Sequence, residues 1–472
     1  MTTMREIASA ASAAAQELRA AMSGKVVLPD DEAYEQTRKV WNGAVDHRPA
    51  LLAICETLED VKAVVCIAQA HGLPLSVRGG GHDWAGRAMR HEGLVIDLSA
   101  MRQVTVNATG RVATVAGGAR ARDVIAATAP HGLTAVTGNC GAVGMAGLTL
   151  GGGYGPLSPR FGLALDNLLG AEIVLADGRC VTADALEHAD LFWALRGGGG
   201  NFGVVTSMRV RLHPIRELLA GIILFPWSEA DAVLHRYAKL VSSAPDELAV
   251  TVGVLSGPDR VPALFLAPTW SGELSQGEGM MDRLKALGTP IVAKIGAMTC
   301  VDHLNMFDAE VVNGRHYALQ TRWLPELTSD AIASLVAAGS KRTSRFAMIA
   351  LHHFRGIPTR IPANASAFGI RQEHFLVEAI AAWEADDDQN GEIHREWARH
   401  LSRVLAPAAL PGGYANLLGP DEHDQIALAY GANIDRLREV KQRFDPDNVF
   451  SAIPLPARGA NELPAQKSVA IL

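Results

Sequence analysis

Residues 138–155 read GNCGAVGMAGLTLGGGYG, and they place a cysteine, Cys140, in a loop made almost entirely of small residues. A cysteine that serves only for packing normally lies in an apolar run, as Cys55 and Cys66 do. Cys140 has no such neighbours in its own segment, so we expect its thiol to be reactive or exposed. The alternative is that Cys140 is only a small, unreactive residue. A protease-type catalytic cysteine is weakly supported, because the loop has no family signature and nothing marks a third residue that would orient the histidine.

A second glycine loop lies earlier in the chain, where residues 77–82 read VRGGGH. The pattern predicts a strand that runs into three glycines, whose backbone N–H groups can form a nest for an anion. A phosphate in that nest would lie beside Arg78, although this side chain could equally be paired elsewhere. His82 then lies near whatever the loop binds, unless the segment is only a tight turn with an incidental histidine.

A third glycine run, residues 198–203, has the formal GxGxxG spacing of dinucleotide-binding loops. That motif requires a strand before it and the N-terminus of a helix after it. Here the preceding residues have a helical pattern and residues 201–215 have that of a strand, which is the reverse order. We therefore reject a Rossmann-type site, while the glycines still permit close approach of a ligand.

The composition excludes several classes of protein. With 472 residues, of which 48% are hydrophobic and 20% charged, the chain is long enough for two or three globular domains. Its net charge of −7 argues against a nucleic-acid partner, and no apolar run approaches the ~20 residues that span a membrane. The five cysteines form no CxxC pair and the N-terminus lacks the features of a secretory signal, so we expect a cytoplasmic protein without a zinc site or a disulfide framework.

The apolar patterns predict an α+β fold in two parts. Up to residue 215, short strands and helices alternate with glycine-rich loops, and from 216 to 405 an antiparallel sheet covered by helices on one face forms a second domain. In the first part we expect helices over 1–24, after residue 54 up to Gly72, over 123–129 and over 191–195. We expect strands at 51–54, 73–77, 93–99, 113–119 and 201–215. A hairpin is expected over 171–184, with its turn at Asp177-Gly178. In the second part we expect strands at 221–227, 247–255, 261–270 and 345–354 and helices over 229–241, 275–287, 329–338 and 392–404. A last helix is expected over 423–442, and the residues after Pro456 are expected to form a loose tail.

The two loops belong to a longer set of motifs that resembles a known family. The further motifs are DNLLGAEIVLADG (166–178), LFWALRGGGGNFGVVT (191–206), GGYANLL (412–418) and YGANIDRLREVKQRFDPDNVF (430–450). Together they resemble the berberine-bridge-enzyme-like flavoproteins of the vanillyl-alcohol-oxidase/p-cresol-methylhydroxylase superfamily, and residues 352–375 resemble the bacterial branch. The resemblance extends over most of the chain, and its paired histidine and cysteine motifs are far more specific than a glycine pattern.

The resemblance implies an FAD-binding domain made of residues 1–215 and of a C-terminal segment, 406–472, that returns to it, with a substrate domain at 216–405 between them. It also implies FAD attached twice, with His82 bonded to the flavin 8α-methyl group and Cys140 bonded to flavin C6. Two links should raise the flavin potential and leave an open cleft for a bulky substrate. The implied reaction removes a hydride from a C–H next to oxygen or nitrogen of a small molecule and passes the electrons to O2, giving H2O2.

Further positions match the family motifs one by one. Val143 falls where the family controls oxygen access, and a small residue there resembles the oxygen-reactive members. The other implied cofactor-binding positions are Arg78, Gly79, Gly80 and Gly81 on the pyrophosphate loop, Gly138, Gly144, Gly147 and Gly152 beside the flavin and ribityl chain, Gly203, Val204 and Val205 at the adenosine half, and Asn416 in the C-terminal signature.

The base that takes the substrate proton is left open by the sequence. The family signature usually has a tyrosine or phenylalanine where this chain has Leu417. Tyr154 matches a catalytic tyrosine of some members, or else it is an aromatic wall, and Tyr414 is a second candidate. A tyrosine base needs its pKa (~10 unperturbed) lowered, whereas a histidine of the pair 352–353, such as His353, needs less adjustment.

Other aromatic and histidine positions allow more than one reading. The adjacent histidines 352 and 353 point to opposite faces of a strand, so we do not expect them to chelate one metal ion. Trp270, Trp323 and Tyr317 either line a substrate wall or pack in the core.

Two alternatives to an oxidase remain at this stage. One is a flavin dehydrogenase that uses an acceptor other than oxygen. The other is a flavin-binding protein without turnover, for which the missing aromatic residue at 417 is the only support. Sugars, alkaloids, cyclic amines and polyketide alcohols all fit the implied chemistry as substrates, and the sequence does not set the oligomeric state.

Overall fold

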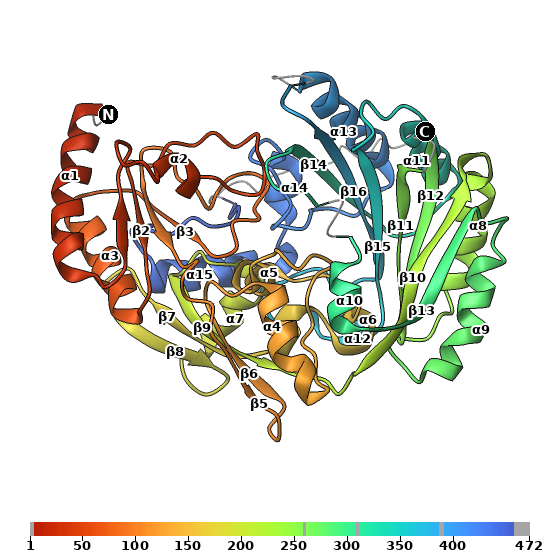
Figure 1. The fold of residues 1–472 in the computed structure, drawn as a ribbon, viewed down its shortest axis with the longest axis horizontal. Helices are drawn as coiled ribbons and strands as arrows, with labels where there is room; N and C mark the ends of the chain where they lie inside the picture. Colours follow the sequence, from red (N-terminus) through yellow and green to blue (C-terminus); the bar gives the residue numbers. More distant parts are fainter. Residues whose placement is uncertain (1–3, 258–260, 308–310, 387–390, 457–472) are drawn as a thin grey trace, which may run out of the picture.

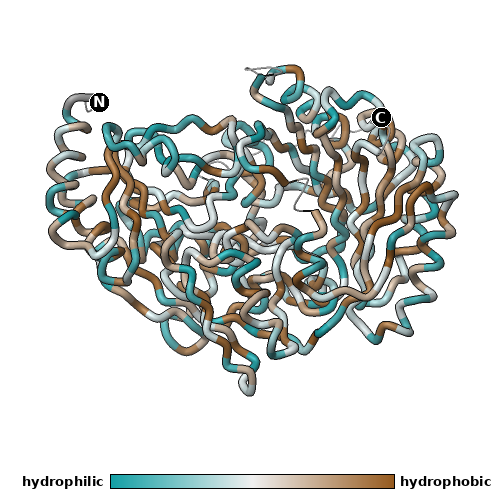
Figure 2. Tube along the Cα trace, viewed as in Figure 1, coloured by the Kyte–Doolittle hydropathy of each residue, from teal (hydrophilic) through white to brown (hydrophobic). Residues whose placement is uncertain are grey.

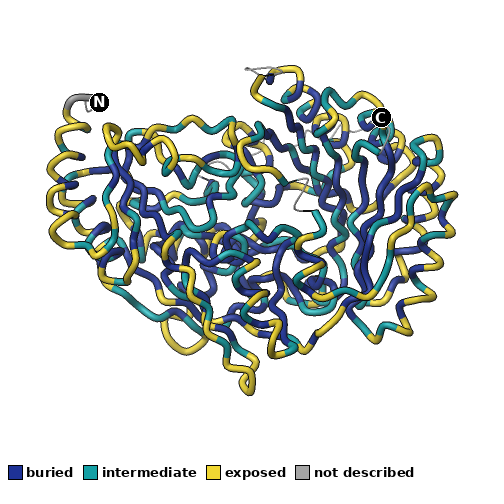
Figure 3. Tube along the Cα trace, in the orientation of Figure 1, coloured by how far each residue is buried: buried dark blue, intermediate teal, exposed yellow. Residues whose placement is uncertain are grey.

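The computed structural model describes residues 4–257, 261–307, 311–386 and 391–456, in which three sheets are flanked by helices (Figure 1). Two smaller sheets lie in one half of the molecule, and a seven-stranded sheet lies in the other. The inner strands of the sheets are hydrophobic and deeply buried, while the outward faces of the surrounding helices are polar and exposed (Figures 2 and 3). No helix in this described part is long and apolar enough to cross a membrane.

The first sheet carries the loop that contains His82. Its strands are ordered β1 (Lys25–Val27), β2 (Leu51–Ile54), β4 (Leu94–Asp97) and β3 (Leu75–Arg78). Both β2 and β3 run parallel to β4, and α3 (Leu58–Ala70) makes the crossover between them, with α1 (Met4–Ala21) packed alongside α3. Helix α3 begins with a capping box, in which the Thr57 side chain accepts from the Asp60 backbone and the Asp60 carboxylate accepts from the Thr57 N–H.

The second sheet supports the loop that contains Cys140. It is antiparallel, with the order β5 (Val104–Asn107), β6 (Val112–Ala116), β9 (Val204–Arg211), β7 (Leu168–Val174) and β8 (Cys180–Asp184). The predicted hairpin is confirmed, because β7 pairs with β8 and Gly178 in the turn has φ +79°. Helices α4 (Ala121–Thr128), α5 (Met145–Gly151) and α7 (Ala189–Gly198) pack against this sheet and share one hydrophobic core with it.

The third sheet has seven antiparallel strands, and one face of it is covered by helices, as the sequence predicts (Figure 1). The order is β13 (Val292–Thr299), β10 (Glu217–Pro226), β12 (Pro262–Trp270), β11 (Leu248–Ser256), β15 (Met348–Phe354), β16 (His374–Trp383) and β14 (His316–Leu324). The covering helices are α8 (Ala230–Val241), α9 (Leu274–Lys285), α11 (Ser329–Ser340) and α13 (Glu392–Leu405). The opposite face is turned toward the other half of the molecule (Figure 1).

Short helices fill the connections, and one predicted helix is wrong. Residues 423–442 form two helices, α14 (His423–Leu428) and α15 (Ile434–Phe444), instead of one. They are separated at Gly431, whose φ of +51° does not belong to an α-helix. The remaining short helices are α2 (Tyr34–Thr37), α6 (Ser158–Phe161), α10 (Cys300–Asn305) and α12 (Ile357–Arg360). The tail predicted after residue 456 lies outside the described residues.

The C-terminal segment returns to the first half of the molecule. Helix α15 packs against α7, and the Lys441 ammonium group donates to the backbone oxygen of Asn201 at 2.7 Å. The same group pairs with the buried carboxylate of Asp445 at 2.6 Å. The Asn201 side chain in turn binds the backbone of residues 452 and 453, so the end of the described chain is fastened to the glycine run before β9.

Candidate active site

One residue from each glycine loop meets at the centre of the candidate site. The Sγ atom of Cys140 is 3.8 Å from Nε2 of His82, although 58 residues separate them in the chain. The two loops touch at Gly80 and Gly144, where a Cβ atom on Gly80 would lie 2.3 Å from the Gly144 backbone nitrogen. Because a side chain at Gly80 would clash there, glycine is what allows the loops to bring the imidazole and the thiol together.

The His82 imidazole is neutral at physiological pH. Burial lowers its pKa to about 4, with a smaller contribution from the positive charge of Arg120. One face of the ring stacks on the Trp41 indole, with centroids 4.3 Å apart and an interplanar angle of 12°. The ring is therefore held in a fixed plane, and one of its nitrogens keeps a lone pair for bonding to an electrophile.

The surroundings of these two residues fit a flavin. At Gly147, in the first turns of α5, no atom lies within 4 Å of the position that a Cβ would take, so a flat ring can approach the backbone. The buried indole Nε1 of Trp41 has no hydrogen-bond partner among the described residues and is free to donate to a bound group. A neutral imidazole beside a thiol also provides the two nucleophiles that a doubly attached flavin requires.

Glycines bracket the helix that follows Cys140. Gly144 is the N-cap of α5, and Gly152 is its C-cap with φ +153°. A Cβ on Gly152 would lie 2.7 Å from the Tyr414 ring, so glycine is needed for this contact. Asn416 donates from its side chain to the Gly147 carbonyl oxygen at 3.1 Å. Val143 lies in the turn between Cys140 and α5, with its N–H directed at the Cys140 carbonyl oxygen.

Arg78 forms an ion pair with a carboxylate of the protein itself. The sequence had left this pairing open as the alternative to a place beside a bound phosphate. Its guanidinium group forms an ion pair with Asp97, whose side chain is fully buried at the end of β4. The same group donates to the backbone oxygens of Thr37 and Lys39. Arg78 therefore anchors the turn after α2 to the end of β3, directly before the loop that leads to His82.

The segment expected at the adenosine half begins strand β9. Val204 and Val205 are buried in the cores of the first half. A Cβ on Gly203 would lie 2.4 Å from the Val174 carbonyl oxygen, so glycine here allows β9 to approach β7. Helix α7 precedes this segment and β9 follows it, which confirms the element order that excludes a Rossmann loop.

Tyr154 and Tyr414 lie together beside the third sheet. Their ring centroids are 4.9 Å apart. The Tyr154 hydroxyl is 3.0 Å from Nε2 of His374, and Nδ1 of His374 is 2.7 Å from the Gln372 carbonyl oxygen. Because Nδ1 must carry the proton to bind that carbonyl, Nε2 is an acceptor and Tyr154 is the donor. The Tyr414 hydroxyl accepts from the Gly153 N–H at 2.8 Å.

Burial controls the protonation of this group. It raises the pKa of Tyr154 well above its ordinary value, and it raises that of Tyr414 to about 12. It lowers the pKa of His374 to about 4. Both phenols and the imidazole are therefore uncharged at neutral pH, and Tyr154 carries its proton in the resting protein.

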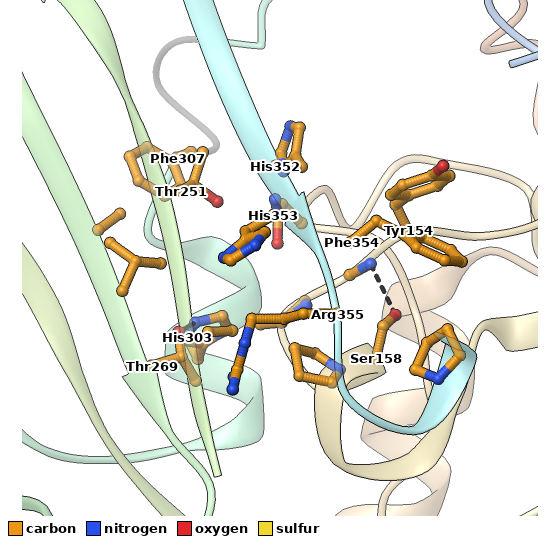
Figure 4. Close-up of a pocket in the computed structure, with 18 of the residues that line it drawn as sticks. Tyr154, Ser158, Thr251, Thr269, His303, Phe307, His352, His353, Phe354 and Arg355 are labelled. Atoms are coloured by element: carbon orange, nitrogen blue, oxygen red, sulfur yellow. Dashed lines mark hydrogen bonds between the residues drawn. The ribbon is translucent and has the colours of Figure 1, made fainter. Parts of the chain in front are cut away.

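A pocket lies between the third sheet and the loop that carries Tyr154 (Figure 4). Its polar lining includes Thr251, Thr269, His303, His352, His353 and Arg355, and Phe307 and Phe354 supply apolar surface. His303 is 2.8 Å from the Thr269 hydroxyl, and burial lowers the pKa of this histidine to about 4. The pocket therefore combines hydroxyl and imidazole groups with one guanidinium group, that of Arg355.

The adjacent histidines of β15 have different neighbours, although both line the pocket. His352 lies 3.7 Å from the Glu378 carboxylate, on the face toward the first half of the molecule. His353 stacks on Phe375, which belongs to the core under the helices, and its Nε2 is 2.9 Å from Glu373. Groups of three metal-ligating side chains are absent from the described part of the chain.

Trp270, Trp323 and Tyr317, which were expected either to line a substrate wall or to pack in the core, have different environments. Trp270 packs in the core under the helices, whereas Trp323 lies 5.3 Å from the His374 ring in the cluster around Tyr154. Tyr317 stacks on Trp41 with centroids 3.9 Å apart.

Sequence reasoning missed several residues of the site, among them His374, Glu378 and Trp41. Glu378 on β16 faces the tyrosines, and burial raises the pKa of its carboxyl group. A lone acidic residue inside the apolar run 375–383 is a signal that could have been used, but the strand itself was not predicted. Trp41, in a polar stretch, carries no signal that relates it to His82.

Known proteins resemble this chain over nearly its whole length. A family model described as an FAD binding domain matches residues 49–184, and one described as berberine and berberine like matches residues 413–453. The chain is 32% identical to the (R)-6-hydroxynicotine oxidase of Paenarthrobacter nicotinovorans over 446 residues, which cover 91% of this chain and 95% of that protein.

Two of the solved structures with this fold illustrate the similarity. The 6-hydroxy-D-nicotine oxidase of Arthrobacter nicotinovorans superimposes with a TM-score of 0.83 at 30% identity, covering 92% of this chain and 97% of that one. A glucooligosaccharide oxidase of Acremonium strictum, described with a 6-S-cysteinyl, 8α-N1-histidyl FAD, has a TM-score of 0.81 at 23% identity and covers 95% and 98%.

Proposed function

Because the chain belongs to the berberine-bridge-enzyme-like family of FAD-linked oxidoreductases, we propose that it is an oxidase whose FAD is bonded to both His82 and Cys140. The observation that carries this proposal is the 3.8 Å distance between Cys140 Sγ and His82 Nε2. One flavin ring can be attached at two points only if both nucleophiles lie at its edge. The doubly linked FAD of the glucooligosaccharide oxidase supports the same arrangement.

The substrate is a small molecule with an oxidisable alcohol or amine carbon. When bound, FAD supplies the chemistry by accepting a hydride from that carbon and passing the electrons to O2, which yields H2O2. The pocket between the third sheet and Tyr154 is the proposed substrate site, and its imidazole, hydroxyl and guanidinium groups would orient a polar substrate. Oxidases among the relatives support turnover over passive flavin binding.

We assign the role of proton acceptor to Tyr154 before the other candidates. Tyr154 lines the pocket, and its own proton is directed at a neutral acceptor, Nε2 of His374. Transfer to His374 is unfavourable in the resting protein because burial disfavours both charges. The transfer must therefore accompany the loss of hydride from the substrate rather than precede it.

The other candidate bases are less well placed. The Tyr414 hydroxyl is occupied by the Gly153 N–H and by the Asn416 side chain, at 2.8 and 3.1 Å. His353 and His352 both line the pocket, but each imidazole already faces a carboxylate, Glu373 at 2.9 Å and Glu378 at 3.7 Å. Tyr414, His352 and His353 are the alternatives to be tested if the Tyr154→Phe variant keeps its rate of flavin reduction.

Rapid mixing distinguishes an oxidase from a dehydrogenase. The purified protein is reduced without oxygen by substrates from the sugar, alkaloid, cyclic amine and polyketide alcohol classes, and is then mixed with aerated buffer. An oxidase returns to the oxidised spectrum within the turnover time and releases one H2O2 for each substrate oxidised. Reduction by substrate followed by slow reoxidation in air, with rapid transfer to a dye, would instead identify a dehydrogenase.

A further inference from the structure

The Trp41 indole is held between two rings from different halves of the molecule. On one side it stacks on His82, with centroids 4.3 Å apart and an angle of 12°. On the other it stacks on Tyr317 of β14, with centroids 3.9 Å apart and an angle of 19°. A continuous stack of three rings thus runs from the His82 loop to the seven-stranded sheet.

The residues around Trp41 fix this stack to the edge of that sheet. We call residues 41–43 the clasp. Asn42 accepts from the Tyr317 N–H at 2.9 Å and donates to the Tyr317 carbonyl oxygen at 3.0 Å. The Gly43 N–H donates to the Arg315 carbonyl oxygen at 2.9 Å, and a Cβ on Gly43 would lie 2.0 Å from the Gly314 carbonyl oxygen. The clasp therefore pairs closely with the chain that enters β14.

The same clasp is also fixed to the His82 loop. The Trp41 N–H donates to the Gly81 carbonyl oxygen at 2.9 Å, one residue before His82. Arg78, paired with the buried Asp97, binds the backbone oxygens of Thr37 and Lys39 just before the clasp. The indole is thus positioned by main-chain contacts on both sides and is not free to follow a moving imidazole.

We propose that Trp41 is a positioning residue for flavin attachment: it holds the His82 imidazole in the plane required for bonding, and through Tyr317 it makes attachment depend on docking of the seven-stranded sheet. This inference rests on the proposed attachment at His82. An imidazole can otherwise rotate about two side-chain bonds, and fixing such a group in a reactive orientation is a large part of what a protein contributes to a bond-forming step. Nε2 of the ring is directed at Cys140, so the stacked plane also keeps the two attachment points together.

The attachment step itself is an oxidation of the flavin methyl group. A bond forms between a His82 nitrogen and the 8α-carbon, while one methyl C–H bond and the imidazole N–H bond break and release two protons. The two electrons left on the flavin pass to O2, which takes up two protons and becomes H2O2. Trp41 takes no part in these transfers and acts only on the orientation of the ring.

The test measures attachment rather than turnover, so it needs no substrate. The variants are Trp41→Leu, which removes the stack, Trp41→Phe, which keeps an aromatic face, and Tyr317→Leu, which removes the outer ring. Trp227→Leu is the matched control, because Trp227 packs on Gly339 and bonds to Ser340 far from the His82 loop. Protein produced without riboflavin is mixed with FAD in air, and peptide mass spectrometry follows the His82–flavin and Cys140–flavin bonds separately.

We expect Trp41→Leu to slow formation of the His82 bond by about tenfold or more, equivalent to about 1.4 kcal/mol. Trp41→Phe should retain most of the rate, and Tyr317→Leu should be intermediate. The Cys140 bond should be affected less than the His82 bond in each case, which separates loss of orientation from loss of FAD binding. The Trp227→Leu control should match the wild type.

Three results would overturn the inference. One is a Trp41→Leu protein that forms the His82 bond at the wild-type rate. Another is equal slowing of both bonds in Trp41→Phe and Tyr317→Leu proteins that melt at the wild-type temperature, because that would indicate impaired FAD binding alone. A wild-type protein with FAD but no bond at His82 would overturn the proposed attachment and this inference with it, whereas the first two results leave the attachment standing.

Discussion

The Tyr154 hydroxyl donates to Nε2 of His374 at 3.0 Å, and Nδ1 of the same ring donates to the Gln372 carbonyl oxygen. These residues lie 220 positions apart, and the contact joins the loop after α5 to the first residue of β16. His374 is fully buried, so a proton that leaves Tyr154 in this direction has no competing route to solvent. The pair is the best-defined proton-accepting arrangement beside the pocket.

Replacement of Tyr154 by phenylalanine tests its role as the base. The ring and its packing remain, and only the hydroxyl is lost, so we expect the anaerobic reduction of the flavin by substrate to slow by about a hundredfold or more. Substrate affinity should change little, because the lost interaction acts mainly in the transition state. Slowing of less than about threefold would show that Tyr154 is a packing residue.

Tyr414→Phe is the matched variant for that experiment. It removes the acceptor of the buried Gly153 N–H, which typically costs about 1–3 kcal/mol of unfolding free energy. We therefore expect a lower melting temperature with a smaller effect on flavin reduction than in Tyr154→Phe. The reverse order of effects on reduction would move the base to Tyr414.

Acid should destabilise the protein through its buried neutral histidines. Burial holds the pKa of His303 near 4, below the ~6.5 of an unfolded chain, so between these values the unfolded state binds the extra proton. Stability should therefore be fully present above about pH 6.5 and fall by about 1.4 kcal/mol per pH unit per such histidine as the pH approaches 4. His82 and His374 share this behaviour in the protein without cofactor.

The histidine contribution is measured by urea unfolding of wild type and His303→Gln at pH 7.5, 6.0 and 5.0. Glutamine keeps a hydrogen-bonding partner for Thr269 but does not titrate. The variant should lose stability less steeply with acid, by about 1.4 kcal/mol per pH unit. Parallel pH profiles for the two proteins would show that His303 is not neutral in the fold.

The sequence predicted those strands whose pattern is locally unambiguous. Strands β10, β11, β12 and β15 are continuous apolar runs and were found, as was the hairpin at Gly178. Edge strand β13 was missed because its residues are largely exposed and include Lys294, so it has no buried face to generate a pattern. Strands β14 and β16 were missed because Arg322 and Glu378 interrupt their apolar runs.

The site was predictable only where residues lie in a family motif. His82 and Cys140 could be related in this way, and the structure brings them to 3.8 Å. The partners of Tyr154 and His82 could not be predicted from the sequence. His374 contacts Tyr154 and Trp41 contacts His82 only through tertiary contacts between distant segments. Helix α5 was also missed: its glycine-rich sequence disfavours an isolated helix, and packing against α7 stabilises it.

Val143 is expected to control the reaction with oxygen. It lies in the turn that follows Cys140, so a longer side chain there would crowd the edge of a flavin held by that cysteine. Val143→Leu should slow reoxidation by air and leave anaerobic reduction by substrate unchanged, as measured in separate stopped-flow experiments. Val143→Ala is the control, and it should reoxidise at least as fast as the wild type. Equal slowing of both half-reactions in Val143→Leu would indicate general damage.

Close contact of the two glycine loops should be essential for double attachment. In Gly80→Ala the new methyl group would meet the Gly144 backbone at 2.3 Å, so the loops must separate. We expect a loss of about 1–3 kcal/mol of unfolding free energy and a lower fraction of doubly linked flavin. Gly279→Ala in α9 is the control, because no atom lies within 4 Å of the added group. Full double attachment in Gly80→Ala would contradict the importance of this contact.

The state of the flavin in the purified protein tests the central claim most directly. The protein is denatured in acid, digested and analysed by peptide mass spectrometry, together with the His82→Ala and Cys140→Ala variants. If FAD is bonded to both His82 and Cys140, all the FAD of the wild type should stay with one cross-linked pair of peptides. Each variant should then retain a single bond at the remaining residue. Release of all FAD from the denatured wild-type protein would contradict the account.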